Sequence, residues 1–170
     1  MEGTIGGRTA SSMPGLDIAE QRAWQHFLDA ALRVHAALNR ELVDAHGLTL
    51  NDVRLLDVLA NSATGSARMG DLADELVSLP SKVTRQIHRL ELQLLVSRCS
   101  APEDGRGVLA TITDEGREAV RVAMSTYGDG VRHHFLSRLS RPQTAAMGEN
   151  CRRIGVAMRS EQVPAPAGRP

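Results

Sequence analysis

Apolar residues recur at three- and four-residue spacing along most of the chain, which predicts a mainly helical protein. The first such stretch runs from residue 17 to about residue 46 and ends at Gly47, a residue type that commonly stops helices. A second helix is expected after Thr49, which can cap it, with Asp52 favourable in the first turn. The expected buried positions are Trp24, Phe27, Leu28, Ala31, Leu38 and Leu42 in the first helix, and Val53, Leu56 and Leu59 in the second.

Two short helical patterns follow, and only a few residues separate them. The first spans residues 69–76, and the second runs from Pro80, which suits the first turn of a helix, to Leu94. A short helix, a tight turn and a second helix form the layout of a helix-turn-helix. The apolar positions are Met69, Leu72, Ala73 and Leu76, then Val83, Ile87, Leu90 and Leu94.

A β-hairpin with a polar tip is expected next. Residues 94–100 and 107–113 are β-prone, and the Pro, Asp and Gly residues between them form turns. Thr113 can cap a long helix beyond the hairpin, and a last helix is expected at residues 142–159. The apolar positions of these two helices are Ala119, Val120, Ala123, Met124, Tyr127, Val131 and Leu136, then Met147, Cys151, Ile154 and Met158.

Composition supports helices over a β-sandwich, because hydrophobic residues make up 42% of the chain and aromatic residues only 2%. The termini, residues 1–15 and 160–170, are rich in glycine or proline and are expected to be disordered tails. Twenty basic and twenty acidic residues cancel. Net charge therefore gives no argument for nucleic acid, and any such site must come from local segregation of charge.

No apolar run approaches the ~18 residues that cross a bilayer, and the N-terminus lacks the pattern of a signal peptide, so a cytoplasmic protein without membrane contact is expected. No phosphate-binding loop, nucleophile elbow or His-Glu-x-x-His motif occurs, so we expect neither an enzyme nor a cofactor. A metal site is not expected either. His133 and His134 are adjacent, and adjacent side chains point in different directions on a helix.

The order of elements resembles the multiple-antibiotic-resistance regulator (MarR) family of winged helix-turn-helix transcriptional regulators. The resemblance covers most of residues 20–158 and rests on "PSKVTR" at the start of the second short helix, "DGRG" at residues 104–107 and "TDEG" at residues 113–116. It implies a winged DNA-binding lobe at residues 49–112. The implied dimerisation helices lie at residues 16–48 and 113–159.

The helix that begins at Pro80 carries the candidate DNA contacts. Val83, Ile87 and Leu90 take its buried face, and no acidic residue occurs from Leu79 to Leu90. An α-helix fits the major groove, where an arginine can bond two acceptors of guanine. The side chains left outside include Ser81, Lys82, Thr84, Arg85 and Arg89.

We expect Arg85 to read a base, and Lys82, Arg89 and Arg98 to contact phosphate, which positions a protein without specifying sequence. An ordinary solvated helix face is the alternative for such a basic pattern. Arg106, flanked by glycines at the hairpin tip, is a candidate for the minor groove. The resemblance implies that Asp104 helps to hold the wing.

The resemblance also implies a homodimer on an inverted-repeat operator, with half-sites about one helical turn apart. A repressor released by a small ligand, such as a phenolic compound, is the expected function. Candidate pocket residues are Trp24 and His35 on the first helix and Arg54 on the second.

Two alternatives remain open. One is a dimeric winged-helix scaffold that contacts only protein. The other is a redox-responsive regulator that uses Cys99 or Cys151, although both thiols are expected to be packing residues.

Overall fold

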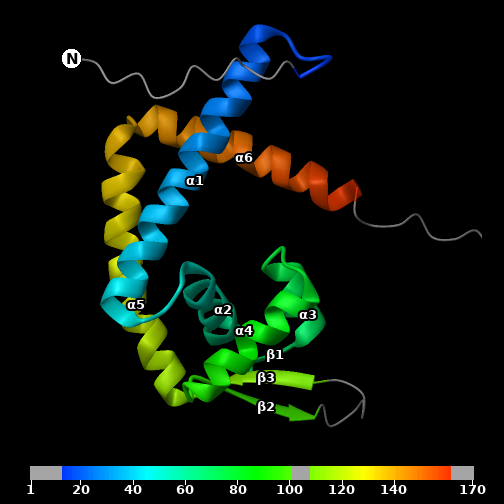
Figure 1. Cartoon of the computed structure of the whole chain (residues 1–170), viewed down its shortest axis with the longest axis vertical. Helices are drawn as coiled ribbons and strands as arrows, with labels where there is room; N and C mark the ends of the chain where they lie inside the picture. Colours follow the sequence, from blue (N-terminus) through cyan, green and yellow to red (C-terminus); the bar gives the residue numbers. More distant parts are fainter. Residues whose placement is uncertain (1–12, 101–107, 162–170) are drawn as a thin grey trace, which may run out of the picture.

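Six α-helices and three short strands make up residues 13–100 and 108–161, the parts of the chain that this computed structural model describes (Figure 1). None of the helices in these parts is long and apolar enough to cross a bilayer. In chain order the elements are α1 (Ile18–His46), α2 (Leu50–Asn61), β1 (Ser66–Arg68), α3 (Met69–Glu75), α4 (Pro80–Leu92), β2 (Val96–Ser100), β3 (Val108–Ile112), α5 (Asp114–His134), a 3-10 turn (Leu136–Arg138) and α6 (Arg141–Glu161).

The expected mainly helical winged helix-turn-helix fold is confirmed, and its helix ends follow the capping residues. Gly47 ends α1 in the left-handed conformation with φ of 66°. The Thr49 side chain accepts a hydrogen bond from the backbone N–H of Asp52, and the Asp52 carboxylate accepts one from Thr49, which completes a capping box at α2. Thr113 caps α5 in the expected way, since its side chain accepts from the Gly116 N–H.

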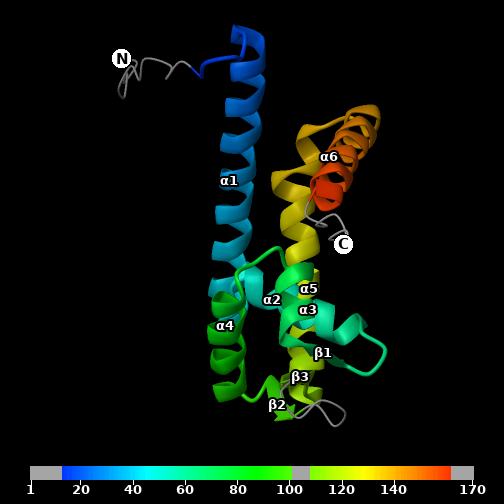
Figure 2. The same ribbon diagram turned by 90° about the vertical axis from the view of Figure 1, so that its right-hand side faces the viewer.

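The helices α1 and α5 run side by side, and α6 leaves the end of α5 at an angle (Figures 1 and 2). Gly130 permits the close approach, because a Cβ atom there would lie 2.7 Å from Leu38 Cδ2. A bond of 2.6 Å joins His134 Nε2 to Glu41 Oε1 across the two helices. The long helices therefore form one body beside the lobe that holds α2, α3, α4 and the strands.

The core lies mainly in that lobe and is built from aliphatic side chains, as the composition predicts. It joins α2, α3 and α4 to the sheet, and Leu38 and Leu42 connect it to α1. The largest fully buried apolar side chains are Leu42, Leu55, Leu56, Leu59, Leu72, Ile87, Leu90, Val53, Val83 and Val96.

Three antiparallel strands form the sheet in the order β1-β3-β2. The expected hairpin is present as β2 and β3, with Cys99 opposite Leu109. Sequence reasoning missed β1, which places Ala67 opposite Ala110. Three residues are too short a run to show the alternation that predicts a strand.

Apolar stripes of three helices differ from expectation. The stripe of α4 was predicted to reach Leu94, but α4 ends at Leu92 and Leu94 is exposed. In α1 only Leu38 and Leu42 are buried, whereas Trp24, Phe27 and Leu28 are each more than two-fifths exposed. The stripe of α5 was predicted to reach Leu136, but α5 ends at His134 and Leu136 begins the 3-10 turn. The N-terminal half of α1 thus has an apolar side that the described chain does not cover.

The capping box of α2 gives a stability prediction. We expect Thr49→Ala to lower the free energy of unfolding by about 1 kcal/mol, because the side-chain acceptor for the Asp52 N–H is lost. Urea unfolding followed by circular dichroism measures this. Thr84→Ala is the matched control, since this exposed hydroxyl bonds only within α4, to the Pro80 carbonyl; equal losses in the two variants would contradict the prediction.

Candidate nucleic-acid interface

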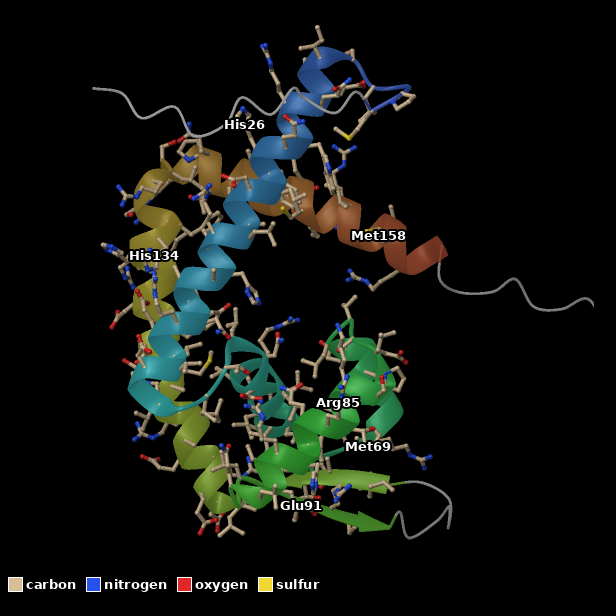
Figure 3. All side chains as sticks on the ribbon, in the orientation of Figure 1. His26, Met69, Arg85, Glu91, His134 and Met158 are labelled. Carbon is tan, nitrogen blue, oxygen red and sulfur yellow. The ribbon has the colours of Figure 1, made fainter. Side chains whose placement is uncertain are left out.

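Helix α4 has one buried and one basic face. Val83, Ile87 and Leu90 are completely buried. Arg85 lies two residues after Val83 and two before Ile87, so at 100° per residue its side chain leaves the helix opposite the core. Arg85 is exposed in the middle of α4, and Glu91 lies towards the sheet (Figure 3). Arg85 therefore points away from the core, on the exposed side of α4.

The start of α4 has no side-chain cap. Leu79 occupies the N-cap position, makes no capping bond and is 62% exposed. Pro80 follows at the first helical position, as expected. The turn before it strains Val77, which has a positive φ of 50°, a conformation that branched side chains rarely adopt. This end of α4 therefore has neither a side-chain cap nor an acidic residue in its first turn.

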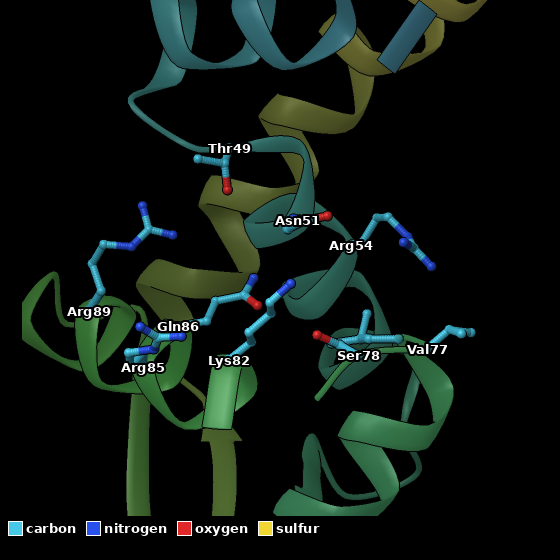
Figure 4. Close-up of a pocket in the computed structure, with 10 residues that line it drawn as sticks. Thr49, Asn51, Arg54, Val77, Ser78, Lys82, Arg85, Gln86 and Arg89 are labelled. Carbon is cyan, nitrogen blue, oxygen red and sulfur yellow. The ribbon is translucent and has the colours of Figure 1, made fainter. Parts of the chain in front are cut away.

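A polar hollow of about 600 Å³ lies between the start of α2 and the outer side of α4 (Figure 4). Arg54 enters its lining from α2, and Lys82 and Arg85 enter it from α4. The side chains of Lys82 and Gln86 extend from α4 towards α2 (Figure 4). Cationic side chains from two helices thus share one surface. The full lining is Thr49, Asn51, Arg54, Leu76, Val77, Ser78, Lys82, Arg85, Gln86 and Arg89.

One of these cationic side chains, that of Arg89, is bonded to a buried carboxylate. Asp52, fully buried, accepts hydrogen bonds from the Gln86 side chain at 3.1 Å and from the Arg89 guanidinium. Arg89 forms an ion pair with this carboxylate while its side chain remains 44% exposed. Arg89 is therefore less available to a ligand than Lys82 or Arg85, whose exposed side chains share the hollow.

Arg98 is also held by an acid. Its Nε donates to Glu91 Oε2 at 2.9 Å, which joins β2 to the last turn of α4. The hydrogen bond from Arg98 lowers the pKa of the Glu91 carboxyl below its ordinary value. The pair links β2 to the last turn of α4 at the surface of the lobe.

The other predicted DNA residues fall in two groups. Ser81 and Thr84 are exposed on α4. Asp104 and Arg106 lie outside the described residues.

The three predicted pocket residues are not brought together. Trp24 and His35 are exposed on α1, while Arg54 lines the polar hollow at α2 and α4. Neither Trp24 nor His35 contributes to that hollow.

Both cysteines are free and exposed, which differs from their expected role as packing residues. Cys99 lies on β2, and Cys151 borders an apolar hollow beside α1, α5 and α6. Among the described residues, no group of three or more His, Cys, Asp or Glu side chains could hold a metal ion.

Sequence reasoning missed Gln86 and the second role of Asp52. The Thr-x-x-Asp pattern identified Asp52 as a residue of the first turn of α2, and the structure adds its contacts with α4. Because Asp52 and Arg89 are 37 residues apart, no local pattern connects them. The available signal was Asp52 itself, a charged residue with a short side chain that lies among the apolar positions of α2.

Comparison with known proteins agrees with this geometry. Residues 46–107 match the profile of the MarR family. The chain is 32% identical to the MarR family transcriptional regulator Sco3205 of Streptomyces coelicolor, solved in complex with DNA, with a TM-score of 0.82 over 88% of this chain and 97% of that one. AbsC, a MarR family transcriptional regulator of the same organism, is 29% identical, with a TM-score of 0.80 over 87% and 99% of the two chains.

A more distant structure shares the fold. BpsR of Bordetella bronchiseptica, whose DNA binding is regulated by 6-hydroxynicotinic acid, is 21% identical, with a TM-score of 0.70 over 79% of this chain and 98% of that one. No curated protein sequence matches the chain significantly.

The fold and the basic face of α4 define a winged helix-turn-helix DNA-binding protein. The match over nearly the full length of Sco3205 then decides the family. The chain belongs to the MarR family of transcriptional regulators, not to a family of enzymes.

Proposed function

We propose that the protein is a repressor that binds an inverted-repeat operator as a homodimer. The acid-free outward face of α4 carries the proposal, since Lys82 and Arg85 present exposed charge where a recognition helix enters the major groove. Sco3205, the relative solved with DNA, supports this use of the fold. A scaffold that contacts only protein would not need this segregation of charge.

Each contact has a proposed role. Arg85 reads a base, because it stands furthest from the core of α4. Lys82, Ser81 and Thr84 contact the phosphates that flank it. Arg106 is proposed for the minor groove on its sequence, with Asp104 supporting the wing. These form the first group of contacts.

A second group consists of Arg89 and Arg98, which were expected to contact phosphate. Each is bonded to an acid of the lobe, Asp52 or Glu91. We propose that Arg98 sets the wing against α4 and leaves most phosphate contacts to the unpaired cations. The role of Arg89 is considered below.

The uncovered apolar side of α1 supports a homodimer. Ile18 and Leu32 on α1, and Ile154 and Met158 on α6, are each more than half exposed. Beside them an apolar hollow of about 530 Å³ lies between α1, α5 and α6. We propose that the same helices of a second copy cover these surfaces, which makes residues 16–48 and 113–159 the dimerisation region and residues 49–112 the DNA-binding lobe.

A solution measurement tests the dimer. We expect sedimentation to give about twice the 18.3 kDa mass of one chain. Ile154→Glu should shift the protein towards the monomer, because it puts a charge into the proposed apolar contact. Glu149→Ala, on the exposed ion pair of α6 with Arg152, is the control expected to leave the dimer unchanged. A monomer in the unsubstituted protein would refute the proposal.

The operator is tested by selection of bound DNA from a random-sequence pool. We expect an inverted repeat whose half-sites are roughly 10 bp apart, the spacing that places two recognition helices on one side of the duplex. Binding should weaken as salt rises. Reporter expression from the selected site, with and without the protein, distinguishes repression from activation. Recovery of no enriched sequence would favour the protein scaffold.

We also propose that a small aromatic ligand releases the DNA. The support is BpsR, whose DNA binding is regulated by 6-hydroxynicotinic acid. Trp24, His35 and Arg54 remain the proposed pocket residues, with the second copy of the chain required to bring them together. Such a ligand acts by binding preferentially to a dimer with wrongly spaced recognition helices.

A further inference from the structure

Asp52 is a carboxylate with none of its surface exposed, and it lies between α2 and α4. Its Oδ2 atom accepts from the Thr49 backbone N–H at 2.8 Å and from the Thr49 hydroxyl at 2.6 Å. Its Oδ1 atom accepts from the Gln86 amide at 3.1 Å and from the Arg89 guanidinium. Only Oδ2 takes part in the capping of α2. The bonds of Oδ1 instead join α2 to α4.

The ion pair with Asp52 affects whether the Arg89 side chain can contact DNA. Arg89 lines the same hollow as Lys82 and Arg85, and its side chain is still 44% exposed. An unpaired cation at this position would add a phosphate contact, and such contacts strengthen binding to every sequence alike. The ion pair with Asp52 compensates the charge and keeps the guanidinium against α2.

We propose that Asp52 is a specificity-determining residue. It withholds the charge of Arg89 from the DNA backbone, which lowers affinity for all DNA, and it holds α4 in the rotation that Arg85 needs to read a base, which favours the operator. The inference rests on the proposed function, because it concerns the same face of α4. Gln86 and Arg89 also fix the rotation of α4 against α2, so Arg85 keeps its outward direction. Asp52 thus acts through Arg89 and does not itself touch DNA.

A purely structural role makes the opposite prediction. If Asp52 only stabilised the lobe, its loss would weaken binding to all DNA. If it restrains a charge, its loss strengthens binding to random DNA and steepens the salt dependence. The sign of the change in random-sequence binding therefore separates the two roles.

The test uses the full-length protein and two variants, Asp52→Asn and the double variant Asp52→Asn with Arg89→Gln. Fluorescence anisotropy measures binding to a labelled random-sequence duplex and to the selected operator between 50 and 200 mM KCl. The double variant removes both members of the pair, so it leaves the net charge unchanged. Circular dichroism melting checks that each variant is folded.

For Asp52→Asn we expect affinity for the random duplex at 50 mM salt to rise by about tenfold for each subunit that gains a phosphate contact. Its salt slope should steepen by about 0.9 per subunit, so a dimer loses ~12-fold more affinity than the unsubstituted protein between 50 and 200 mM. Operator affinity should rise less, because loss of the Asp52 bonds also frees the rotation of α4 and weakens the base contact of Arg85. The ratio of operator affinity to random-sequence affinity should therefore fall. The double variant should return random-sequence affinity and slope to those of the unsubstituted protein.

Three results would overturn the inference. Random-sequence affinity that is unchanged or lower in Asp52→Asn would leave only the structural role. A double variant with a shallower slope than the unsubstituted protein would mean that Arg89 already contacts phosphate; this comparison holds even if Asp52→Asn does not fold, because removing both partners strands no buried charge. If the unsubstituted protein bound no DNA at all, the proposed function would fail first.

Discussion

Gly116→Ala should destabilise the protein by about 3 kcal/mol or more, a severe loss for a helical glycine. An added Cβ atom would lie 2.1 Å from the Leu95 carbonyl oxygen and 2.8 Å from Ile112 Cγ1. The first neighbour is backbone, so it cannot turn away as the end of a flexible side chain can. Either the start of α5 or the turn before β2 must move. Urea unfolding at a fixed protein concentration measures the loss.

The same helix offers a matched control. Gly128 is exposed on α5, and a Cβ atom there would meet nothing within 4 Å. Gly128→Ala should therefore stabilise the protein by about 0.5 to 1 kcal/mol, because alanine loses less backbone entropy in a helix. Similar stabilities for the two variants would show that α5 and the turn at Leu95 do not pack as described.

Arg85→Ala should reduce operator affinity by about 30-fold or more. A good bidentate contact with guanine is worth about 1 to 3 kcal/mol, and the proposed dimer makes one such contact in each half-site. The loss should fall mainly on the operator, since a base contact adds little to binding of random DNA. Titration of both duplexes at one salt concentration measures the two affinities. Selection should then show relaxed preference at one position of each half-site.

Two other substitutions provide comparisons for the DNA binding of Arg85→Ala. Lys82→Ala should weaken operator and random DNA alike and make the salt slope shallower by about 0.9 per subunit, as expected for a phosphate contact. Arg121→Ala, which breaks an exposed pair with Glu118 on α5, should leave DNA binding unchanged. The assignment would be abandoned if Arg85→Ala behaved like Arg121→Ala.

Local signals predicted much of this fold. Gly47, Thr49 and Thr113 each mark a helix end, and each does so through bonds within four residues along the chain. The strands of the hairpin were also predicted, because a turn-rich segment separates two β-prone runs. Such features depend on neighbouring residues alone, and a sequence displays them directly.

Contacts between distant segments were not predictable in the same way. The stripe of α1 looked like an ordinary core face, yet Trp24 and Phe27 remain exposed, because periodicity shows amphipathicity and not what covers it. The outward basic positions of α4 were predicted correctly, but the pairing of Arg89 with Asp52 was not. A helical pattern gives the direction of a side chain, whereas its partner depends on the packing of another helix.

The two buried glycines of α5 have a mechanical consequence. Gly116 packs against the turn before β2, and Gly130 packs against α1, so one helix is clamped near both ends. At 1.5 Å per residue the clamps are about 21 Å apart, and a tilt of about 5° around Gly130 displaces Gly116 by about 2 Å. The flexible ends of Leu38 and Glu41 beside Gly130 can adjust to such a tilt, whereas the Leu95 backbone beside Gly116 cannot turn away, so a tilt of α5 would carry the turn before β2 with it.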